Sequence, residues 1–301
     1  MSPQTVLTIV GARPQFVKAA AVSKALRQHS REVLLHTGQH YDHAMSHAFF
    51  DELGIPAPDI NLGVGSGSHA AMTGAMLQGI DAAIREIKPD LVMIYGDTNS
   101  TLAGALAASK IPVPLAHIEA GLRSRRMDMP EEINRLVADR LAQLLFAPTK
   151  EAVANLAQEG VTQGVHEVGD VMYDAFLFFR ERALRESRIL DSLDSDGSPY
   201  FVATVHRAEN TDSLDRLRAI LAALENAPVD VYLPLHPRTR HVLDDAGISV
   251  GGRVHLIEPL GYLDLLALGG QARAILTDSG GVQKEAYWAG VPCITLRRET
   301  E

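Results

Sequence analysis

Three carboxylic acids stand at places in the sequence where proton-transfer chemistry is expected. Asp97 and Glu119 each follow a short apolar segment, at residues 91–94 and 111–116, and Glu131 lies in the polar segment after them. Short apolar segments bounded by turn residues are typical of buried strands, and ligands of open α/β sheets bind at the carboxyl ends of strands. Carboxylates at that edge can accept and donate protons. The sequence therefore predicts that Asp97, Glu119 and Glu131 share one reaction cleft.

These carboxylates also have a structural interpretation. Pro130 begins a predicted helix, and Glu131 and Glu132 fall in its first turn, where the helix dipole stabilises acidic residues without any catalytic role. Asp97 is of a residue type that caps helices, and a helix is predicted directly after it. Both interpretations stay open at the level of the sequence.

Basic residues follow the first predicted strand, at residues 6–10, and indicate a site for an anion. Arg13 comes just after this strand, and Pro14 and Lys18 belong to the helix that opens there. The free N–H groups of a first helical turn attract anions, and the two basic side chains add positive charge. A solvated basic helix start is the structural alternative, but the position of Arg13 at a strand end favours a binding site.

A second set of polar residues follows strands in the C-terminal half. His206 and Arg207 follow one predicted strand, and Ser279 and Gly280 follow another. The sequence Asp-Ser-Gly-Gly around Ser279 also occurs at the nucleophile of trypsin-like proteases, but those proteins are all-β. Small residues that open a helix instead form a cradle of backbone N–H groups for a phosphate. We therefore expect these four residues to hold a diphosphate, with Glu285 farther along the helix accepting hydrogen bonds from a ribose.

Strand and helix patterns alternate along nearly the whole chain. This rhythm predicts an α/β fold with parallel sheets flanked by helices. A length of 301 residues is enough for two domains, and the polar segment at 191–199 is typical of a loop near their junction. The predicted domains are residues 1–170, with the three carboxylates, and residues 171–301, with the phosphate site. Cys293 lies in an apolar segment and is expected to be a small buried core residue.

Composition and charge argue against several classes of partner. The net charge is −9 and no run of Lys and Arg occurs, which disfavours nucleic acid and anionic membranes. No apolar segment approaches the roughly 18 residues of a membrane-spanning helix, and the amino terminus lacks the basic segment of a signal peptide. A single cysteine cannot form an internal disulfide, which fits a reducing compartment. We expect a cytoplasmic protein that binds neither nucleic acid nor membrane.

Two motifs invite a cofactor, but each lacks a required part. His40, His43 and His47 suggest a zinc site, yet no recognisable carboxylate or thiolate pattern such as HExxH accompanies them. Residues 65–70 formally match the dinucleotide fingerprint, but the proline-containing segment before them does not form the long apolar strand that the motif needs. We therefore expect polar loops at both places, with no metal and no nicotinamide.

Six motifs, taken in order, carry a resemblance to a known family. They are Gly11-Ala12-Arg13-Pro14, Gly96-Asp97-Thr98, His117-Ile118-Glu119-Ala120-Gly121-Leu122-Arg123, Pro130-Glu131-Glu132-Ile133-Asn134-Arg135, Thr204-Val205-His206-Arg207 with Glu209-Asn210, and Thr277-Asp278-Ser279-Gly280-Gly281. Over essentially its whole length the chain resembles the non-hydrolysing UDP-N-acetylglucosamine 2-epimerases. Residues 96–109, 129–135 and 202–210 look closest to the branch that acts on UDP-2,3-diacetamido-2,3-dideoxyglucuronate.

The resemblance implies a GT-B architecture, with two Rossmann-like domains, the sugar nucleotide in the cleft between them and usually a dimer. It implies epimerisation at C2 of a UDP-2-acetamido sugar: a base removes the C2 proton as UDP leaves C1, and UDP re-adds to the glycal with protonation of the opposite face. No metal or cofactor is required. The residues that match the family's groups are Asp97, Glu119, Glu131 and His206 for catalysis, Arg13, Lys18, His206, Ser279 and Gly280 for the diphosphate, and Glu285 for the ribose.

The sequence departs from the family's pattern at three places. Leu260 and Leu265 stand where a glutamine and a phenylalanine often lie near the uracil, so the base contacts are expected to come mostly from the backbone. Gln39 and His40 match part of the substrate-activation site of some members, but Asp42 does not. Family members continue past the last residue of this chain, so the second domain is expected to be truncated at its end.

Alternatives to the leading hypothesis remain at this level. The sugar is N-acetylglucosamine or a diacetamido uronate, and Arg125 and Arg126 are candidate partners for a uronate carboxylate, with solvated surface arginines as the alternative. A hydrolysing epimerase that releases UDP and free sugar is a second enzyme class. A UDP-sugar-binding protein without turnover is the third interpretation.

Overall fold

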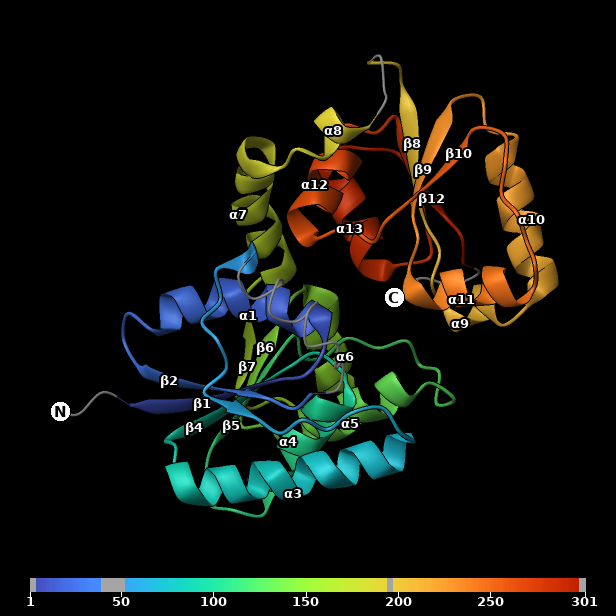
Figure 1. The fold of residues 1–301 in the computed structure, drawn as a ribbon. Coiled ribbons are helices and arrows are strands. Elements are labelled where there is room, and N and C mark those ends of the chain that lie inside the picture. Colours follow the sequence, from blue (N-terminus) through green and yellow to red (C-terminus); the bar gives the residue numbers. More distant parts are fainter. Residues whose placement is uncertain (1–3, 39–51, 194–196, 298–301) are drawn as a thin grey trace. The chain divides into compact units, whose positions relative to one another are not determined.

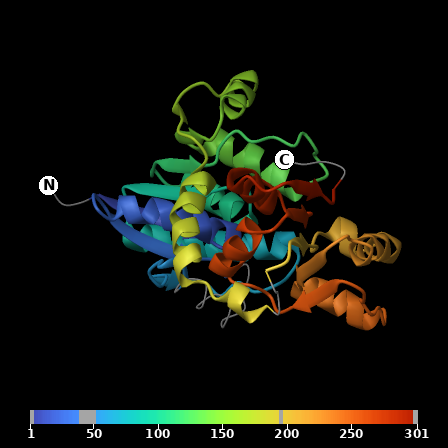
Figure 2. The same cartoon turned by 90° about the horizontal axis from the view of Figure 1, so that it is seen from above.

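The computed structural model of the protein describes residues 4–38, 52–193 and 197–297. The chain divides into two compact units, Met1–Ala175 and Phe176–Glu301. In Figure 1 and in the rotated view of Figure 2, each unit is a sheet with helices packed on it, coloured blue to green in the first unit and yellow to red in the second.

Within the described residues, the N-terminal unit holds a seven-stranded parallel sheet with the strand order β3-β2-β1-β4-β5-β6-β7. The residues of β1, β4 and β5 are almost all buried, because helices cover both faces of a parallel sheet, and their apolar sequences suit that environment. The strand order reverses between β1 and β4, and ligands of open sheets bind beside such a reversal. The strands are β1 (Thr5–Val10), β2 (Arg31–His36), β3 (Ile60–Asn61), β4 (Leu91–Tyr95), β5 (Leu115–Ile118), β6 (Leu144–Ala147) and β7 (Val165–Glu167).

Close packing of one helix positions the polar turn after β4. A Cβ added to Gly104 of α4 would lie 2.8 Å from the Ile94 side chain and 3.1 Å from that of Ile9. A glycine at this position therefore lets α4 approach β1 and β4 closely, which accounts for its small residues. The helices of this part of the chain are α1 (Arg13–Leu26), α3 (His69–Ile87), α4 (Asn99–Ser109), α5 (Pro130–Leu141), α6 (Lys150–Gln158) and α7 (Val171–Glu186).

The described part of the C-terminal unit repeats the pattern with a five-stranded parallel sheet in the order β10-β9-β8-β11-β12. Its order reverses between β8 and β11, whose carboxyl ends lead into the second set of predicted site residues. The strands are β8 (Tyr200–Thr204), β9 (Asp230–Pro234), β10 (Val254–Ile257), β11 (Ala274–Thr277) and β12 (Cys293–Thr295). The helices are α8 (Ile189–Ser192), α9 (Ala208–Thr211), α10 (Leu214–Glu225), α11 (Pro237–Asp245), α12 (Tyr262–Gly270) and α13 (Gly280–Ala289).

The predicted fold class is confirmed: the chain is an α/β protein with two Rossmann-like units and parallel sheets. The prediction for Cys293 is wrong, because this residue is exposed on β12, the last strand of its sheet. Within the described residues β12 pairs with β11 alone, which leaves its apolar residues uncovered there. Three short elements, β3, α8 and α9, were not predicted, and α8 overlaps the start of the predicted loop at 191–199. Among the described residues, no helix is both long and apolar enough to cross a membrane.

Candidate functional site

One buried amide joins the ends of β1 and β4. Gln15 of α1 is 1% exposed. Its Oε1 accepts hydrogen bonds from the N–H groups of Gly11 at 2.7 Å and Ala12 at 3.1 Å, and its Nε2 donates to the Tyr95 carbonyl at 2.7 Å. The side chain thereby holds the turn after β1 against the turn after β4. Gln15 was not singled out from the sequence. The feature that could have indicated it is a polar residue directly after Pro14, the last residue of the first motif.

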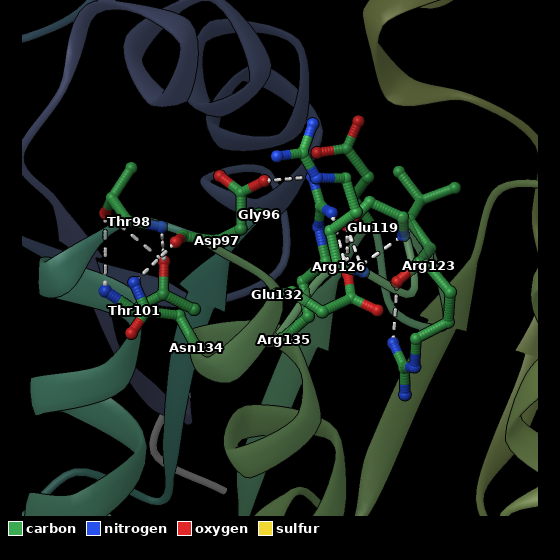
Figure 3. A network of polar contacts seen from close by, with 12 residues as sticks. Gly96, Asp97, Thr98, Thr101, Glu119, Arg123, Arg126, Glu132, Asn134 and Arg135 are labelled. Atoms are coloured by element: carbon green, nitrogen blue, oxygen red, sulfur yellow. Dashed lines mark hydrogen bonds and ion pairs between the residues drawn. The ribbon is translucent and has the colours of Figure 1, made fainter. Parts of the chain in front are cut away.

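Asp97 lies in the turn after β4 and is held by α5 (Figure 3). Its Oδ2 accepts a hydrogen bond from Arg135 Nη2 at 2.6 Å, and its backbone carbonyl accepts one from Asn134 Nδ2 at 2.8 Å. The Asp97 side chain remains 29% exposed. The N-cap interpretation of Asp97 is wrong, because Thr98 caps α4 by accepting the N–H of Thr101. The carboxylate of Asp97 is therefore oriented by an arginine and still accessible.

Glu119 follows β5 and has the backbone conformation of a left-handed residue, with φ of 71°. This conformation is costly for a side chain other than glycine and is found most often at functional sites. The Glu119 carboxylate forms an ion pair with Lys18 Nζ. A Cβ on Gly96 would lie 3.3 Å from Glu119 Oε2 and 3.3 Å from Lys18 Nζ. The Glu119 carboxylate thus lies over Gly96, the residue directly before Asp97.

The structure separates the two adjacent glutamates of the α5 first turn. Glu132 is 1% exposed and accepts hydrogen bonds from the N–H groups of Ser124 at 2.9 Å and Arg125 at 2.8 Å. Burial raises the pKa of Glu132, but these N–H groups together with the Ser124 hydroxyl and Arg135 outweigh it, so the pKa lies below its usual value. Glu132 therefore shapes the loop between β5 and α5, whereas Glu131 is half-buried in the same turn. Both glutamates lie in the first turn of α5; Glu132 is occupied by the loop, and the catalytic role of Glu131 stays a prediction.

In the C-terminal unit, a buried aspartate orients His206. Asp278 is fully buried, and its Oδ1 lies 3.0 Å from His206 Nδ1. Its Oδ2 accepts hydrogen bonds at 2.9 Å from the backbone N–H groups of His206 and Arg207. Burial raises the pKa of Asp278, but the hydrogen bond from His206 and the other donors outweigh this and lower the pKa to about 2. The ionised carboxylate fixes the hydrogen of His206 on Nδ1 and leaves Nε2 as the nitrogen that can meet a ligand.

The predicted phosphate cradle has the geometry of a helix N-terminus. Ser279 caps α13, its Oγ accepting the N–H of Val282 at 3.4 Å. A Cβ on Gly280 would meet no atom within 4 Å, so open space lies beside the first turn. The Nε of Arg207 is buried and forms no hydrogen bond with the described residues. Glu285 is 8% exposed one turn farther along α13. These groups can hold an anion through backbone N–H groups and a guanidinium.

Some predicted residues fall outside what the structure describes. The Arg13 side chain is one of these, and so are Gln39, His40, Asp42, His43 and His47, which carried the zinc and activation-site interpretations. Among the described residues, no cluster of His, Cys, Asp and Glu could hold a metal ion. Arg126, a candidate partner for a uronate, pairs with Asp128 at 2.7 Å on the exposed surface, and its contact with a uronate stays a prediction.

The fold places the chain in a broad class of two-unit α/β proteins. A solved complex of a UDP-glucosyltransferase from Polygonum tinctorium has the same fold at 12% identity, with a TM-score of 0.59 over 99% of this chain and 81% of that one. A family model described as UDP-N-acetylglucosamine 2-epimerase matches residues 24–301. The protein belongs to this epimerase family.

Relatives and solved structures agree with that assignment. A UDP-N-acetylglucosamine 2-epimerase homolog of Methanococcus maripaludis is 51% identical, over 98% of this chain and 84% of the relative. The UDP-2,3-diacetamido-2,3-dideoxy-D-glucuronate 2-epimerase of Pseudomonas aeruginosa is also 51% identical, with the same coverage. The Methanocaldococcus jannaschii UDP-GlcNAc 2-epimerase, solved in complex with UDP-GlcNAc and UDP, is 41% identical with a TM-score of 0.91, covering 99% of this chain and 85% of that one.

Proposed function

We propose that this protein epimerises C2 of a UDP-2-acetamido sugar by eliminating UDP and adding it back. The observation that carries the proposal is the carboxylate pair at the ends of β4 and β5: Glu119 lies over Gly96, and Asp97 is the next residue. Removal and return of a proton on opposite faces of one carbon require more than one acid–base group, and these neighbouring strand ends supply two. Family membership supports the same reaction.

The reaction breaks and re-forms two bonds without a cofactor. A carboxylate takes the proton from C2, the electrons of the C–H bond form the C1–C2 double bond, and the C1–O bond breaks to release UDP. The glycal then accepts a proton at C2 from the opposite face while a UDP oxygen bonds to C1. The carboxylates proposed for the two proton transfers are Asp97, Glu119 and Glu131, and either direction uses the same groups.

Expulsion of UDP places negative charge on a diphosphate, and donors that meet this charge lower the barrier. His206, oriented by Asp278, is proposed to donate from Nε2, with the first turn of α13 and Arg207 as further donors. Arg13 and Lys18 are proposed to add positive charge from the N-terminal unit. Lys18 pairs with Glu119, so its ammonium group lies beside one of the proposed proton-transfer carboxylates. The ribose contact is assigned to Glu285.

This mechanism assigns a role to each domain. Residues 1–170 would carry the proton-transfer groups and residues 171–301 the UDP-binding groups. We further propose a cytoplasmic homodimer that needs no metal or other cofactor. Both 51%-identical relatives favour a 2-acetamido sugar, and the Pseudomonas aeruginosa relative makes the diacetamido uronate the second candidate substrate.

Deuterium incorporation tests the reaction and its alternatives. The protein is incubated in D2O with UDP-N-acetylglucosamine or with UDP-2,3-diacetamido-2,3-dideoxyglucuronate, and C2 is followed by NMR. Deuterium at C2 of intact UDP-sugar is expected with one of the two. Free sugar with UDP would instead identify a hydrolase, and binding without exchange would identify a binding protein.

Amide variants test the proton-transfer groups. Asp97→Asn, Glu119→Gln and Glu131→Gln should each lower C2 exchange by about 10² to 10⁴, since an amide cannot carry the proton. Asp128→Asn is the matched control, because Asp128 lies on the same loop region but is 68% exposed and paired with Arg126. Wild-type exchange in all three amide variants would contradict the carboxylate assignment.

A further inference from the structure

A buried polar cluster lies beside Glu119 and consists of side chains with no proposed contact to the substrate. His117 on β5 is 0% exposed and Asp139 on α5 is 1% exposed. Asp139 Oδ1 lies 2.7 Å from His117 Nδ1, and His117 Nε2 lies 2.7 Å from the carbonyl oxygen of Gly96. The two residues are 22 positions apart in the sequence, and the cluster forms only when α5 packs against β5.

Hydrogen-bond chemistry fixes the protons of this cluster. A carbonyl oxygen only accepts, so His117 Nε2 must carry a hydrogen. Asp139 Oδ2 accepts from the Gly121 N–H at 3.0 Å and pairs with Arg123 Nη1 at 2.8 Å. Burial raises the pKa of Asp139, but His117 and Arg123 outweigh it and hold the pKa below its usual value. Since Arg123 and the Gly121 N–H both require Asp139 to accept, the hydrogen of the Asp139–His117 hydrogen bond is assigned to His117 Nδ1.

The cluster brackets Glu119 on both sides in the sequence. His117 lies two residues before it and Gly121 two residues after it, and both bond to the same carboxylate of Asp139. Between them the chain turns through the left-handed conformation of Glu119, with φ of 71°. The N–H groups of Glu119 and Ala120 both reach the Phe146 carbonyl at 3.1 Å. A non-glycine residue keeps such a conformation only where its surroundings impose it.

The same cluster also reaches the turn that carries Asp97. His117 holds the Gly96 carbonyl, while the Gly96 N–H donates to the Ile118 carbonyl at 2.9 Å. Gly96 itself has a φ of 58°. Two backbone turns with positive φ, one before Asp97 and one at Glu119, are therefore tied to a single buried carboxylate.

We propose that Asp139 is a positioning residue that sets the two proposed proton-transfer carboxylates relative to one another. It acts through His117 on the Gly96 turn, and through His117 and Gly121 on the strained backbone of Glu119. Asp139 touches no substrate. The proposal rests on the proposed function, because Asp97 and Glu119 are assigned proton transfer there.

Asp139→Asn tests the proposal with little change in shape. The asparagine amide has one acceptor oxygen where the carboxylate has two, and its N–H₂ group only donates. It therefore cannot accept hydrogen bonds from His117, Gly121 and Arg123 at the same time. A displacement of about 1 Å at a reacting group lowers a rate by about a hundredfold, so kcat for C2 exchange should fall by about that factor. The KM of the UDP-sugar and the Kd of UDP should stay within threefold of wild type, because the UDP-binding groups are untouched.

Glu159→Gln is the matched control. Glu159 pairs with Arg123 Nη2 at 2.7 Å on the outer side of the cluster and does not contact His117 or Gly121. Its kcat should stay within threefold of wild type. A folded Asp139→Asn protein with wild-type kcat, or one whose KM and kcat change alike, would overturn the proposal.

The nitrogen NMR signals of His117 give a second readout that needs no variant activity. In ¹⁵N-histidine-labelled wild-type protein at neutral pH, both ring nitrogens of His117 should show the shifts of protonated nitrogen, with His117→Gln used to assign the signals. A neutral ring would overturn the proposal even if Asp139→Asn fails to fold. Absence of C2 exchange in the wild type would count against the proposed function, and the His117 signals would still decide the hydrogen-bond arrangement.

Discussion

Two histidine–aspartate pairs lie near strand ends of the two units, and their surroundings differ. In the N-terminal unit, His117 is fully buried, and both ring nitrogens face acceptors at 2.7 Å. In the C-terminal unit, the His206 side chain is 33% exposed, and its Nδ1 lies 3.0 Å from the fully buried Asp278. The first histidine is used entirely within the protein, whereas the second keeps Nε2 for a ligand.

The difference shows that the residue pair alone does not define the role. A buried aspartate holds the ring in both cases. The two rings differ at the second nitrogen. A backbone carbonyl accepts from His117 Nε2 and makes that ring a structural bridge, whereas the His206 side chain is partly exposed and is the one proposed for proton donation. The following predictions test this distinction.

The largest effect is expected at the exposed ring. His206→Asn should lower C2 exchange by about 10² to 10⁴, because the proposed donor to the leaving UDP is lost. The asparagine amide can still donate to Asp278, so the fold around β8 should persist. Exchange is measured by NMR in D2O, with circular dichroism to verify folding. A rate within threefold of wild type would remove His206 from the mechanism.

Removal of the buried His117 ring should lower the free energy of unfolding more than removal of the His206 ring. His117→Ala removes one partner of the buried Asp139, which keeps Arg123 and the Gly121 N–H, and loss of a partner from a buried ion pair costs about 3 kcal/mol. His206→Ala removes a half-exposed hydrogen bond, and a loss of about 1 kcal/mol is expected. Urea unfolding of both variants measures the free energies. Equal losses would contradict the distinction between the two pairs.

The Asp278 carboxylate should make the free energy of unfolding depend on pH in the acidic range. Its pKa is lowered from 3.8 to about 2 in the folded protein, so the folded state binds the proton less well than the unfolded state. The lowered pKa contributes about 2 kcal/mol to the free energy of unfolding. This contribution is fully present well above pH 4 and is lost as the pH falls through about 2. The measurement is urea unfolding of wild type and Asp278→Asn between pH 5 and 2. The stability difference between the two proteins should shrink across this range, and a constant difference would contradict it.

The smallest effect is expected at the outer edge of the buried cluster. Glu159 is 36% exposed where it pairs with Arg123. Arg123 is 3% exposed but keeps Asp139 as its second partner, so Glu159→Gln should lower the free energy of unfolding by only about 1 kcal/mol. The same urea titration measures it. A loss as large as that of His117→Ala would mean that the cluster extends to Glu159.

Much of the fold followed from local pattern. Short apolar segments alternating with helical patterns predicted two parallel sheets, and Thr149 caps the predicted helix α6 by accepting the N–H of Ala152 at 3.1 Å. The positions of Asp97 and Glu119 at strand ends were also predictable, because the apolar segments end just before them. Cys293 was misplaced, since sequence pattern does not distinguish an edge strand from a central one.

The residues that hold the site turns in place through hydrogen bonds could not be predicted from local sequence pattern. Gln15 bonds to Tyr95, 80 positions away, and Asp139 bonds to His117, 22 positions away. Such partners have no spacing rule, because they meet only when separate elements pack together. The roles of the adjacent Glu131 and Glu132 were likewise inseparable until the loop between β5 and α5 was seen to use Glu132.

The sequence by itself determined the α/β class, the parallel sheets and the strand ends that carry the acidic and basic residues, because these depend on the alternation of apolar and polar residues along the chain. Tertiary structure decided which carboxylate is oriented by Arg135, which glutamate lies over Gly96 and which histidine is buried. Those properties arise from hydrogen bonds between distant elements. Burial also sets the protonation states, since a charge removed from water persists only beside the partners that folding brings to it.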